Sequence, residues 1–252
     1  MTNYDGRMGR PKLLVTGAAG RIGKAFSSIV ADRFDLALTD RREDLGNSAS
    51  PVRSMDITDF SACVKACEGM DMVLHLAADP SPAADFIRSL LPTNIVGTYN
   101  VFTAAAQAGC QRVVFASSAQ AVEGYPLDLQ VTESMAPRPK NLYGVTKAFG
   151  EALAAQVASE TGMTCVAVRI ANVADFFIGE SHSARDVAAF ISEWDVVHLL
   201  ERSLIADIQG FYVFHGVSNN RYKRLSIHET MRSCQYEPKD DAFEILGFPI
   251  PR

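Results

Sequence analysis

The chain has 252 residues, of which 48% are hydrophobic and 21% are charged, and its formal net charge at pH 7 is −5. This length supports one sizeable hydrophobic core, and the acidic balance argues against nucleic acid or an anionic membrane as the main partner. No apolar run approaches the roughly 18 residues that a membrane span needs, and the polar residues 1–10 are unlike a signal sequence. We expect residues 1–11 to form a loose tail and residues 12–252 to form one domain.

The first predicted element is a short buried strand, 12–16, which runs directly into a glycine-rich turn. Glycines at 17, 20 and 23 permit a tight turn, close approach of a pyrophosphate to the backbone, and close packing of the next helix. Alone, such a turn can be only a turn, but here an amphipathic helix, 22–33, follows and its N-terminus would face the phosphate. The motif therefore predicts a dinucleotide site with contacts from Gly17, Ala19, Gly20, Arg21, Ile22 and Gly23.

The second predicted strand, 35–39, ends in Asp40. A carboxylate in this place accepts hydrogen bonds from the ribose hydroxyls of NAD and repels the extra phosphate of NADP. Arg41 and Arg42 follow directly, and guanidinium groups there could bind that phosphate instead. We therefore expect NAD, with NADP as the alternative, and place both Asp40 and Arg41 at the cofactor.

Strands and helices alternate along the rest of the chain, which is typical of a parallel sheet with helices on both faces. The loops at 79–82, 126–139 and 172–185 follow strand ends, where ligands bind in such sheets. The predicted fold class is α/β, a Rossmann-type doubly wound parallel sheet with a small C-terminal substrate lobe built mainly from 79–93, 119–142, 171–195 and 216–252. Further strands are expected at 72–76, 112–116, 164–170 and 211–215, and further helices at 60–67, 94–108, 143–160, 194–205 and 226–234.

The most informative stretch begins the helix at 143–160 and reads Tyr143-Gly144-Val145-Thr146-Lys147. Side chains four residues apart share a helix face, so the Lys147 ammonium would lie beside the Tyr143 phenol and favour its ionised form. A tyrosine with a pKa near ~10 is a poor base at neutral pH unless a positive neighbour lowers that pKa. Alone, the spacing also fits a solvated helix face. Together with the glycine turn it predicts a general base.

With these two motifs, the chain resembles the extended short-chain dehydrogenase/reductase family, also called the NAD-dependent epimerase/dehydratase family, over nearly its whole length. Four further stretches match in order: Asp56-Ile57 after a third strand, His75-Leu76-Ala77-Ala78, Asn94 in a helix, and Phe115-Ala116-Ser117-Ser118 at a strand end. The resemblance implies further cofactor contacts from Asp56, Ile57, Leu76, Ala77, Ala78, Asn94, Ala116, Tyr143, Lys147 and Ile170.

The resemblance also implies a catalytic set of Ser118, Tyr143, Lys147 and Asn94. Ser118 would hydrogen-bond the substrate oxygen and Tyr143 would move the proton. Lys147 would hold the nicotinamide ribose and lower the pKa of the phenol, while Asn94 would prop the active-site helix. Without the family, Ser118 reads as a hydroxyl cap at a strand end and Asn94 as a partner of nearby backbone.

The C-terminal part suggests a branch of the family. After the strand at 211–215 only residues 216–252 remain, too few for the larger lobe with which members hold a nucleotide-linked sugar. The segments around 124–126, 183–185, 191–195 and 236–241 resemble the uronate dehydrogenases, which oxidise the anomeric carbon of a hexuronic acid with NAD. That resemblance implies that Arg185 grips a sugar-acid carboxylate. A solvated loop charge, or an ion pair with Asp186, is the alternative interpretation of Arg185.

Several positions depart from that branch, namely Pro80, Ala119, Gln120 and Asn172, so the chemistry should carry over better than the exact sugar. Ala119 and Gln120 stand where dehydratases of the family carry Asp-Glu, and without that acid-base pair elimination lacks its catalysts. We place Ser118, Gln120, Asn172 and Arg185 at the substrate.

The predicted function is an NAD-dependent oxidoreductase that acts on a sugar or sugar acid, with Tyr143 as base. A sugar epimerase that retains its NAD is the alternative, and a non-catalytic NAD-binding regulator fits less well because both Tyr143 and Lys147 are present. We also expect free thiols in a reducing cytoplasm and no bound metal. The family resemblance further implies a homodimer or a larger homo-oligomer. The dimer would form through the helices 94–108 and 143–160, whose alanines would allow close approach or would instead face the sheet: Ala104, Ala105, Ala108, Ala152, Ala154 and Ala155.

Overall fold

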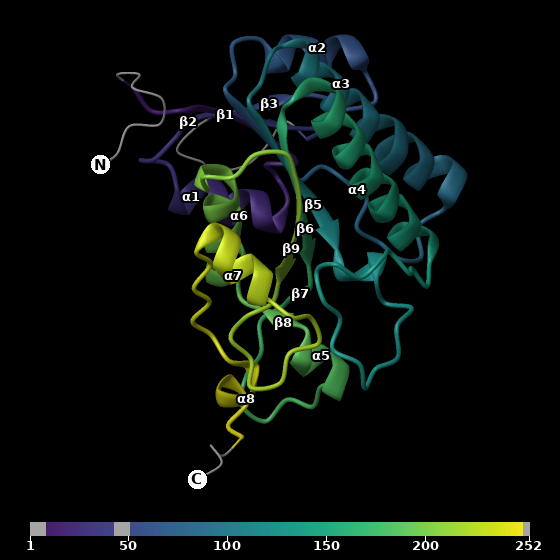
Figure 1. Cartoon of the computed structure of the whole chain (residues 1–252), viewed down its shortest axis with the longest axis vertical. Helices are drawn as coiled ribbons and strands as arrows, with labels where there is room; N and C mark the ends of the chain where they lie inside the picture. Colours follow the sequence, from purple (N-terminus) through teal and green to yellow (C-terminus); the bar gives the residue numbers. More distant parts are fainter. Residues whose placement is uncertain (1–8, 43–50, 249–252) are drawn as a thin grey trace.

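The computed structural model describes residues 9–42 and 51–248, and at its centre lies a parallel sheet of seven strands (Figure 1). The strand order is β3-β2-β1-β4-β5-β6-β9, and every neighbouring pair is parallel. The order reverses between β1 and β4, so the crevice at the carboxyl ends of these two strands is the expected ligand site of such a sheet. The strands are β1 (Lys12–Thr16), β2 (Asp35–Asp40), β3 (Val52–Ser54), β4 (Met72–His75), β5 (Arg112–Ser118), β6 (Thr164–Ile170) and β9 (Phe211–Gly216).

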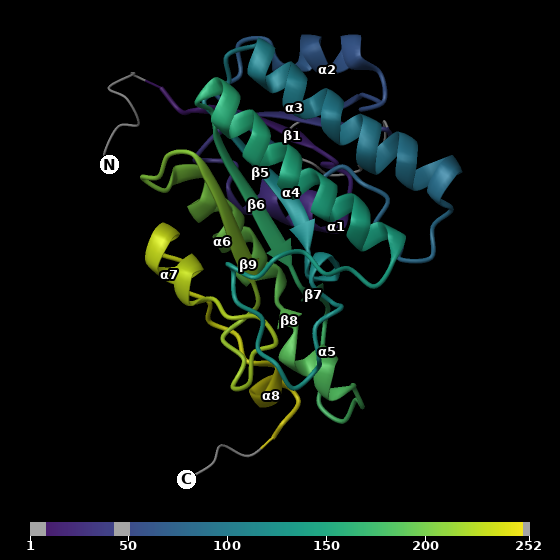
Figure 2. The same cartoon turned by 45° about the vertical axis from the view of Figure 1, so that its right-hand side comes forward.

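Helices cover both faces of this sheet (Figure 2). On one face, α1 (Arg21–Ile29) and α6 (Glu193–Ile205) enclose a core that includes Phe26, Val15 and Leu200. On the other face lie α2 (Phe60–Cys67), α3 (Thr98–Gln107) and α4 (Leu142–Thr161), over a second core. Successive strand residues enter opposite cores, as Leu14 and Val15 do, because side chains alternate along a strand. The predicted Rossmann-type fold is confirmed.

One helix begins earlier than the sequence predicts. The helix expected at 94–108 is preceded without a break by the wide π-helix η2 (Phe86–Gly97), whose N-cap Asp85 accepts a hydrogen bond from the Arg88 backbone N–H. Pro92 lies inside η2. A proline lacks the N–H of a regular helix and normally marks a helix boundary, which is why the pattern indicates a start two residues after it.

The substrate side contains short elements, one of which, α7 (His228–Cys234), is the helix predicted at 226–234. No periodicity indicates the others: η3 (Ala119–Ala121), β7 (Asn172–Val173), α5 (Ala184–Ala188), β8 (Phe190–Ile191) and α8 (Ala242–Ile245). The strands β7 and β8 pair in parallel, and α5 and α8 pack around a small apolar cluster that includes Phe176 and Phe190. Figure 1 shows β7, β8, α5 and α8 together beyond the carboxyl ends of β5, β6 and β9. Within residues 9–42 and 51–248, no helix has the length and apolarity to cross a bilayer.

Candidate active site

The turn between β1 and α1 has room only for glycine at its ends. Gly17 has a φ of +72°, and a Cβ there would lie 2.6 Å from the Ala77 backbone nitrogen. A Cβ on Gly23 would lie 2.5 Å from the Gly17 carbonyl oxygen. Gly20 is the N-cap of α1 and no side chain caps the helix, so the N–H groups of its first turn face the site without a side-chain partner. This is the backbone arrangement that binds a pyrophosphate.

Asp40 lies at the carboxyl end of β2, beside this turn, and is 9% exposed. Its Oδ2 accepts a hydrogen bond from the Ala19 N–H at 3.0 Å, and its Oδ1 accepts from the Arg42 N–H at 3.0 Å. The Arg42 guanidinium is ion-paired with Asp40 at 3.3 Å, whereas Arg41 is exposed. An adenosine ribose therefore fits between a fixed carboxylate and the glycine turn, and the residues present suit NAD.

The expected adenine contacts lie farther along the same edge. Asp56 is exposed and accepts a hydrogen bond from the Thr58 N–H, whereas Ile57 is buried. A Cβ on Gly97 would lie 2.5 Å from Ile57 Cδ1, so η2 packs directly on Ile57.

The Tyr143, Lys147 and Ser118 side chains meet at the carboxyl end of β5. Asn141 caps α4 by accepting a hydrogen bond from the Gly144 N–H at 2.7 Å, which fixes the first turn that carries Tyr143. Lys147 is buried, and its Nζ donates to the Ala116 carbonyl at 2.7 Å and lies 5.5 Å from the centre of the Tyr143 ring. Ser118 is the neighbouring side chain that favours the ionised form of the Tyr143 phenol.

Burial decides the protonation of this group. It raises the pKa of Tyr143, and the hydrogen bond with Ser118 offsets part of that rise, while the charge of Asp79 adds to it. Burial also lowers the pKa of Lys147 to about 7. The expectation that Lys147 lowers the pKa of the phenol is therefore wrong for the polypeptide by itself, because burial outweighs every other influence on the phenol.

Asn94 does not touch Tyr143 but connects two elements of the site. Its Nδ2 donates to the Asp79 carbonyl at 3.0 Å and to Thr146 Oγ1 at 3.2 Å, and its Oδ1 accepts from the Asp79 N–H at 2.8 Å. Asn94 thus joins η2 to the loop after β4 and to α4. This agrees with a residue that props the active-site helix.

The glycine turn and the Tyr143 group line one cavity of about 450 Å³. Seven of the predicted site residues do not line it: Ala19, Asp40, Arg41, Asp56, Ile57, Ala77 and Asn94. Residues that the cavity adds to the sequence-based set are Pro80, Pro82, Ser117, Ala119, Ala171 and Val173. The predicted residues on its wall are Gly17, Gly20, Arg21, Ile22, Gly23, Leu76, Ala78, Ala116, Ser118, Gln120, Tyr143, Lys147, Ile170, Asn172 and Arg185.

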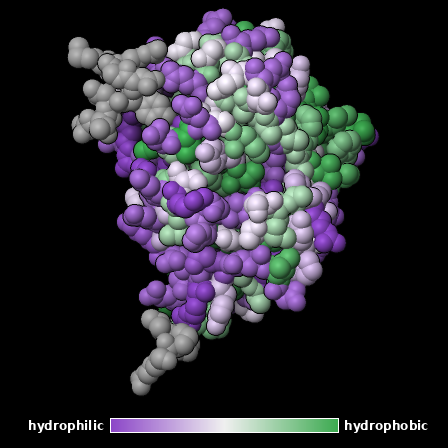
Figure 3. All heavy atoms as spheres, viewed as in Figure 1, coloured by the Kyte–Doolittle hydropathy of each residue, from purple (hydrophilic) through white to green (hydrophobic). Residues whose placement is uncertain are grey.

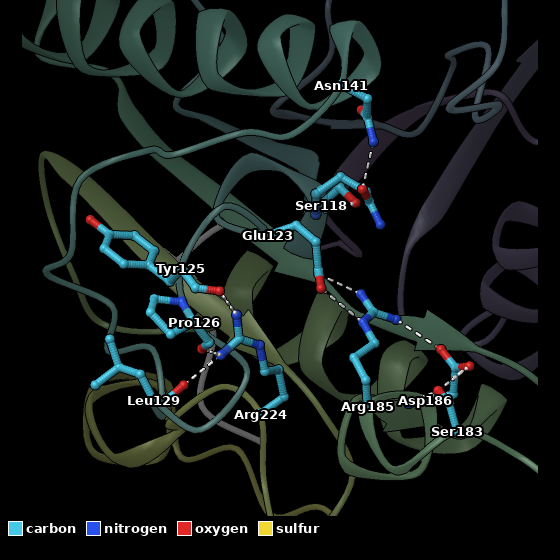
Figure 4. Close-up of polar contacts among 11 residues, drawn as sticks. Ser118, Glu123, Tyr125, Pro126, Leu129, Asn141, Ser183, Arg185, Asp186 and Arg224 are labelled. Atoms are coloured by element: carbon cyan, nitrogen blue, oxygen red, sulfur yellow. Dashed lines mark hydrogen bonds and ion pairs between the residues drawn. The ribbon is translucent and has the colours of Figure 1, made fainter.

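Two of the expected substrate residues, Gln120 and Arg185, already form hydrogen bonds with other side chains of the protein. Gln120 Oε1 accepts a hydrogen bond from Asn141 Nδ2 at 2.8 Å, so Gln120 supports the cap of α4. Arg185 follows the N-cap of α5, Ser183, and is 20% exposed. Figure 4 shows its guanidinium between the carboxylates of Glu123 and Asp186.

Glu123 is the partner that the sequence does not reveal. Arg185 Nε donates to Glu123 Oε1 at 3.0 Å and Nη2 to Oε2 at 2.5 Å, while Nη1 donates to Asp186 Oδ1 at 3.1 Å. The hydrogen bond to Glu123 is the main reason that the pKa of Arg185 is raised. The ion pair with Asp186 was one of the alternatives for Arg185, but no local pattern indicates Glu123, which lies 62 residues away. Arg185 also lines a neighbouring cavity of about 590 Å³, between the loop at 127–130 and α8.

Together, the parallel sheet, the glycine turn and the Tyr143 group define a dinucleotide-binding protein of the Rossmann type. The sequence matches the NAD dependent epimerase/dehydratase family over residues 13–201, and the chain belongs to this family. Both the fold and the family resemblance are thereby confirmed.

Particular relatives are sugar dehydrogenases. The NAD-dependent glucose-6-phosphate dehydrogenase of Haloferax volcanii is 34% identical over 94% of this chain and 97% of its own length. A uronate dehydrogenase of Agrobacterium fabrum is 33% identical over 83% of this chain and 77% of its own length. The crystal structure of uronate dehydrogenase from Agrobacterium tumefaciens superposes with a TM-score of 0.83 at 31% identity, covering 94% of this chain and 88% of that one.

Proposed function

We propose that the protein is an NAD-dependent sugar dehydrogenase that oxidises the anomeric hydroxyl carbon of a free sugar or sugar acid. The observation that carries the proposal is that Ser118, Tyr143 and Lys147 line the same cavity as the glycine turn. A relative of which 97% aligns with this chain is named an NAD-dependent glucose-6-phosphate dehydrogenase, and a uronate dehydrogenase variant has been crystallised in complex with NAD.

Tyr143 is the proposed base. Its phenolic oxygen takes the proton of the sugar hydroxyl, and Ser118, on the same cavity wall, donates to the same substrate oxygen as it becomes a carbonyl. Bound NAD supplies the acceptor for the hydride that leaves the sugar carbon. Lys147, whose Nζ lies 5.5 Å from the centre of the Tyr143 ring, holds a ribose hydroxyl. Asn94 holds helix α4, and the loop that follows β4, in position around these groups.

Asp40 and the glycine turn favour NAD over NADP. The carboxylate of Asp40 neutralises Arg42, so a 2′-phosphate would meet a carboxylate and not a free guanidinium. Arg41 remains the residue that would accept the phosphate if the preference were reversed.

Sugar epimerisation is the second candidate function for the same catalytic residues, and the comparisons favour the dehydrogenase. The UDP-glucose 4-epimerase 2 of Arabidopsis thaliana is 33% identical but over only 58% of this chain and 47% of its own length.

The test is a panel of free aldoses, uronic acids and sugar phosphates, each offered with NAD and with NADP while the absorbance of the reduced nicotinamide is followed. We expect net reduction of NAD with at least one free sugar and slower reduction of NADP. Purified protein that retains NAD tightly and gives no net reduction would instead identify an epimerase.

We further propose that the protein forms a homodimer through η2, α3 and α4. Five large apolar side chains on these helices are exposed, namely Ile87, Val96, Tyr99, Leu142 and Val145, and Figure 3 shows apolar residues gathered at the right-hand edge, over η2 and α4. Three of the six alanines face the sheet instead, because Ala104, Ala105 and Ala154 are fully buried, whereas Ala152 is exposed. Light scattering that gives the mass of a monomer would contradict the dimer.

A further inference from the structure

The positively charged side chains on the wall of the active-site cavity all have hydrogen-bond or ion-pair partners within the protein. Among the described residues that line it, three are cationic: Arg21, Lys147 and Arg185. Lys147 donates to a backbone carbonyl, and Arg21, at the glycine turn, pairs with Asp175 at 2.7 Å. Both lie at the cofactor end of the cavity. Only Arg185 is placed to meet the far end of a sugar whose reacting hydroxyl lies at Tyr143.

Arg185 offers no net positive charge to such a sugar. One guanidinium faces two carboxylates, Glu123 and Asp186, so the three groups together carry a formal charge of −1. The Nε and Nη2 atoms, which form the two-pronged face that best fits a carboxylate, both donate to Glu123. This pair is partly shielded from water, with side-chain exposures of 20% and 12%, so it is stronger than an ordinary surface ion pair.

An acidic sugar would therefore have to expel Glu123 from Arg185 or enter a cluster that is already negative. Both routes are unfavourable, because like charges repel strongly where water is partly excluded. A neutral sugar meets neither obstacle. Arginine has five N–H donors, and three of them point to Glu123 and Asp186, which leaves two for the hydroxyl oxygens of an uncharged sugar.

We propose that Glu123 determines the substrate specificity by occupying two hydrogen-bond donors of Arg185 from within the protein, so that the substrate is a neutral aldose and not a uronic acid. This inference rests on the proposed sugar dehydrogenase activity. Glu123 acts here through Arg185 and is a positioning residue. It takes the place that the carboxylate of an acidic sugar would occupy.

The test compares sugars that differ only at C6, D-glucose with D-glucuronic acid and D-galactose with D-galacturonic acid, in wild type and Glu123→Gln. The amide keeps the size of the side chain but presents an N–H₂ group to one arginine N–H, which frees that N–H and removes the negative charge. We expect wild type to have the higher kcat/KM for the neutral sugars. We expect Glu123→Gln to shift the ratio of kcat/KM values toward the uronic acids by at least about tenfold.

Glu229→Gln is the matched control, because it also removes the carboxylate partner of an arginine, Arg232, but on α7 and away from the cavity. It should leave the ratio as in wild type. Glucose 6-phosphate is tested alongside, since its phosphate is a second kind of anion. Higher kcat/KM of wild type for a uronic acid or for glucose 6-phosphate than for the matched neutral sugar would overturn the inference, and so would an unchanged ratio in Glu123→Gln.

Calorimetric titration of glucuronic acid into each NAD-loaded protein separates the two proposals. A wild-type protein that reduces no NAD with any sugar would remove the proposed activity, yet binding would still decide the role of Glu123. Glucuronic acid that binds Glu123→Gln more tightly than wild type supports that role, and equal binding contradicts it. Glu123→Ser, which shortens the side chain, provides a second variant should the amide prevent folding, with far-ultraviolet circular dichroism as the check.

Discussion

The two ends of the active-site cavity are built on different principles. At the glycine turn, local sequence determines the geometry: Gly17 must be glycine because of its φ of +72° and the 2.6 Å approach to Ala77. At the sugar end, the chemistry depends on a contact between Glu123, on a loop, and Arg185, in the first turn of α5, which lie 62 residues apart in the sequence. The comparison teaches that a cofactor site can be recognised from a short motif. The sugar site can be interpreted only when the hydrogen-bond and ion-pair partners of each charged group are known.

The largest effect is expected at Tyr143, where the two ends meet. Tyr143→Phe removes the phenolic oxygen but keeps the ring, so turnover should fall by roughly 10²- to 10⁴-fold. NAD binding, measured by calorimetry, should stay close to that of wild type because the glycine turn is untouched. Tyr212→Phe, on β9 and outside the cavity wall, is the control and should keep full turnover. Full activity of Tyr143→Phe would remove the proposed mechanism.

The glycine end can be tested with two alanine substitutions at similar backbone angles. Gly17 and Gly162 have φ values of +72° and +74°, but a Cβ on Gly162 has no heavy atom within 4 Å. Gly162→Ala should therefore cost only the strain of a positive φ, roughly 1 kcal/mol of unfolding free energy. Gly17→Ala should cost more and should also weaken NAD binding.

Urea unfolding and NAD titration of both variants provide the measurement. If Gly17→Ala were no less stable than Gly162→Ala and bound NAD normally, the cofactor end would not be fixed by backbone geometry, and the contrast with the sugar end would fail.

A smaller effect is expected from pH, because burial lowers the pKa of Lys147 from 10.5 to about 7. Between these values the unfolded state binds the proton and the folded state does not, so Lys147 makes the unfolding free energy rise with pH. Below about pH 7 both states bind the proton, and the contribution to the slope disappears. The difference in unfolding free energy between wild type and Lys147→Met should therefore change by up to about 1.4 kcal/mol per pH unit within this window.

Urea unfolding at several pH values measures this difference, with Lys140→Met, an exposed lysine in the loop before α4, as the control for the loss of a charge. A difference that does not vary with pH would show that Lys147 stays protonated in the folded protein throughout.

Much of the sheet was predictable because its strands are buried apolar runs, and β1 and β6 begin and end at the predicted residues. The catalytic tyrosine, lysine and serine positions were predictable for a related reason, since the spacing of Tyr143 and Lys147 and the strand end at Ser118 are local features. The structure brings these residues to one cavity wall, although their catalytic roles stay predictions.

The remainder depended on tertiary structure. The pKa of Tyr143 follows burial, which a spacing of four residues does not reveal. Because Pro92 normally marks a helix boundary, the sequence did not indicate that η2 begins before it. The short strands β7 and β8 form because they pair with each other. Glu123 stands between a buried valine and a glycine and shows no pattern of its own. Its importance arises from Arg185 alone.

The loop that carries Glu123 is anchored by the last part of the chain. Arg224 donates to the carbonyls of Tyr125, Pro126 and Leu129 (Figure 4). The N–H of Val131 in turn donates to the Arg224 carbonyl. During synthesis the ribosome releases the glycine turn and the tyrosine helix long before residue 224, so the nucleotide half of the cavity can assemble first. The sugar end, in contrast, stays incomplete until Arg224 is available to hold the loop next to Glu123.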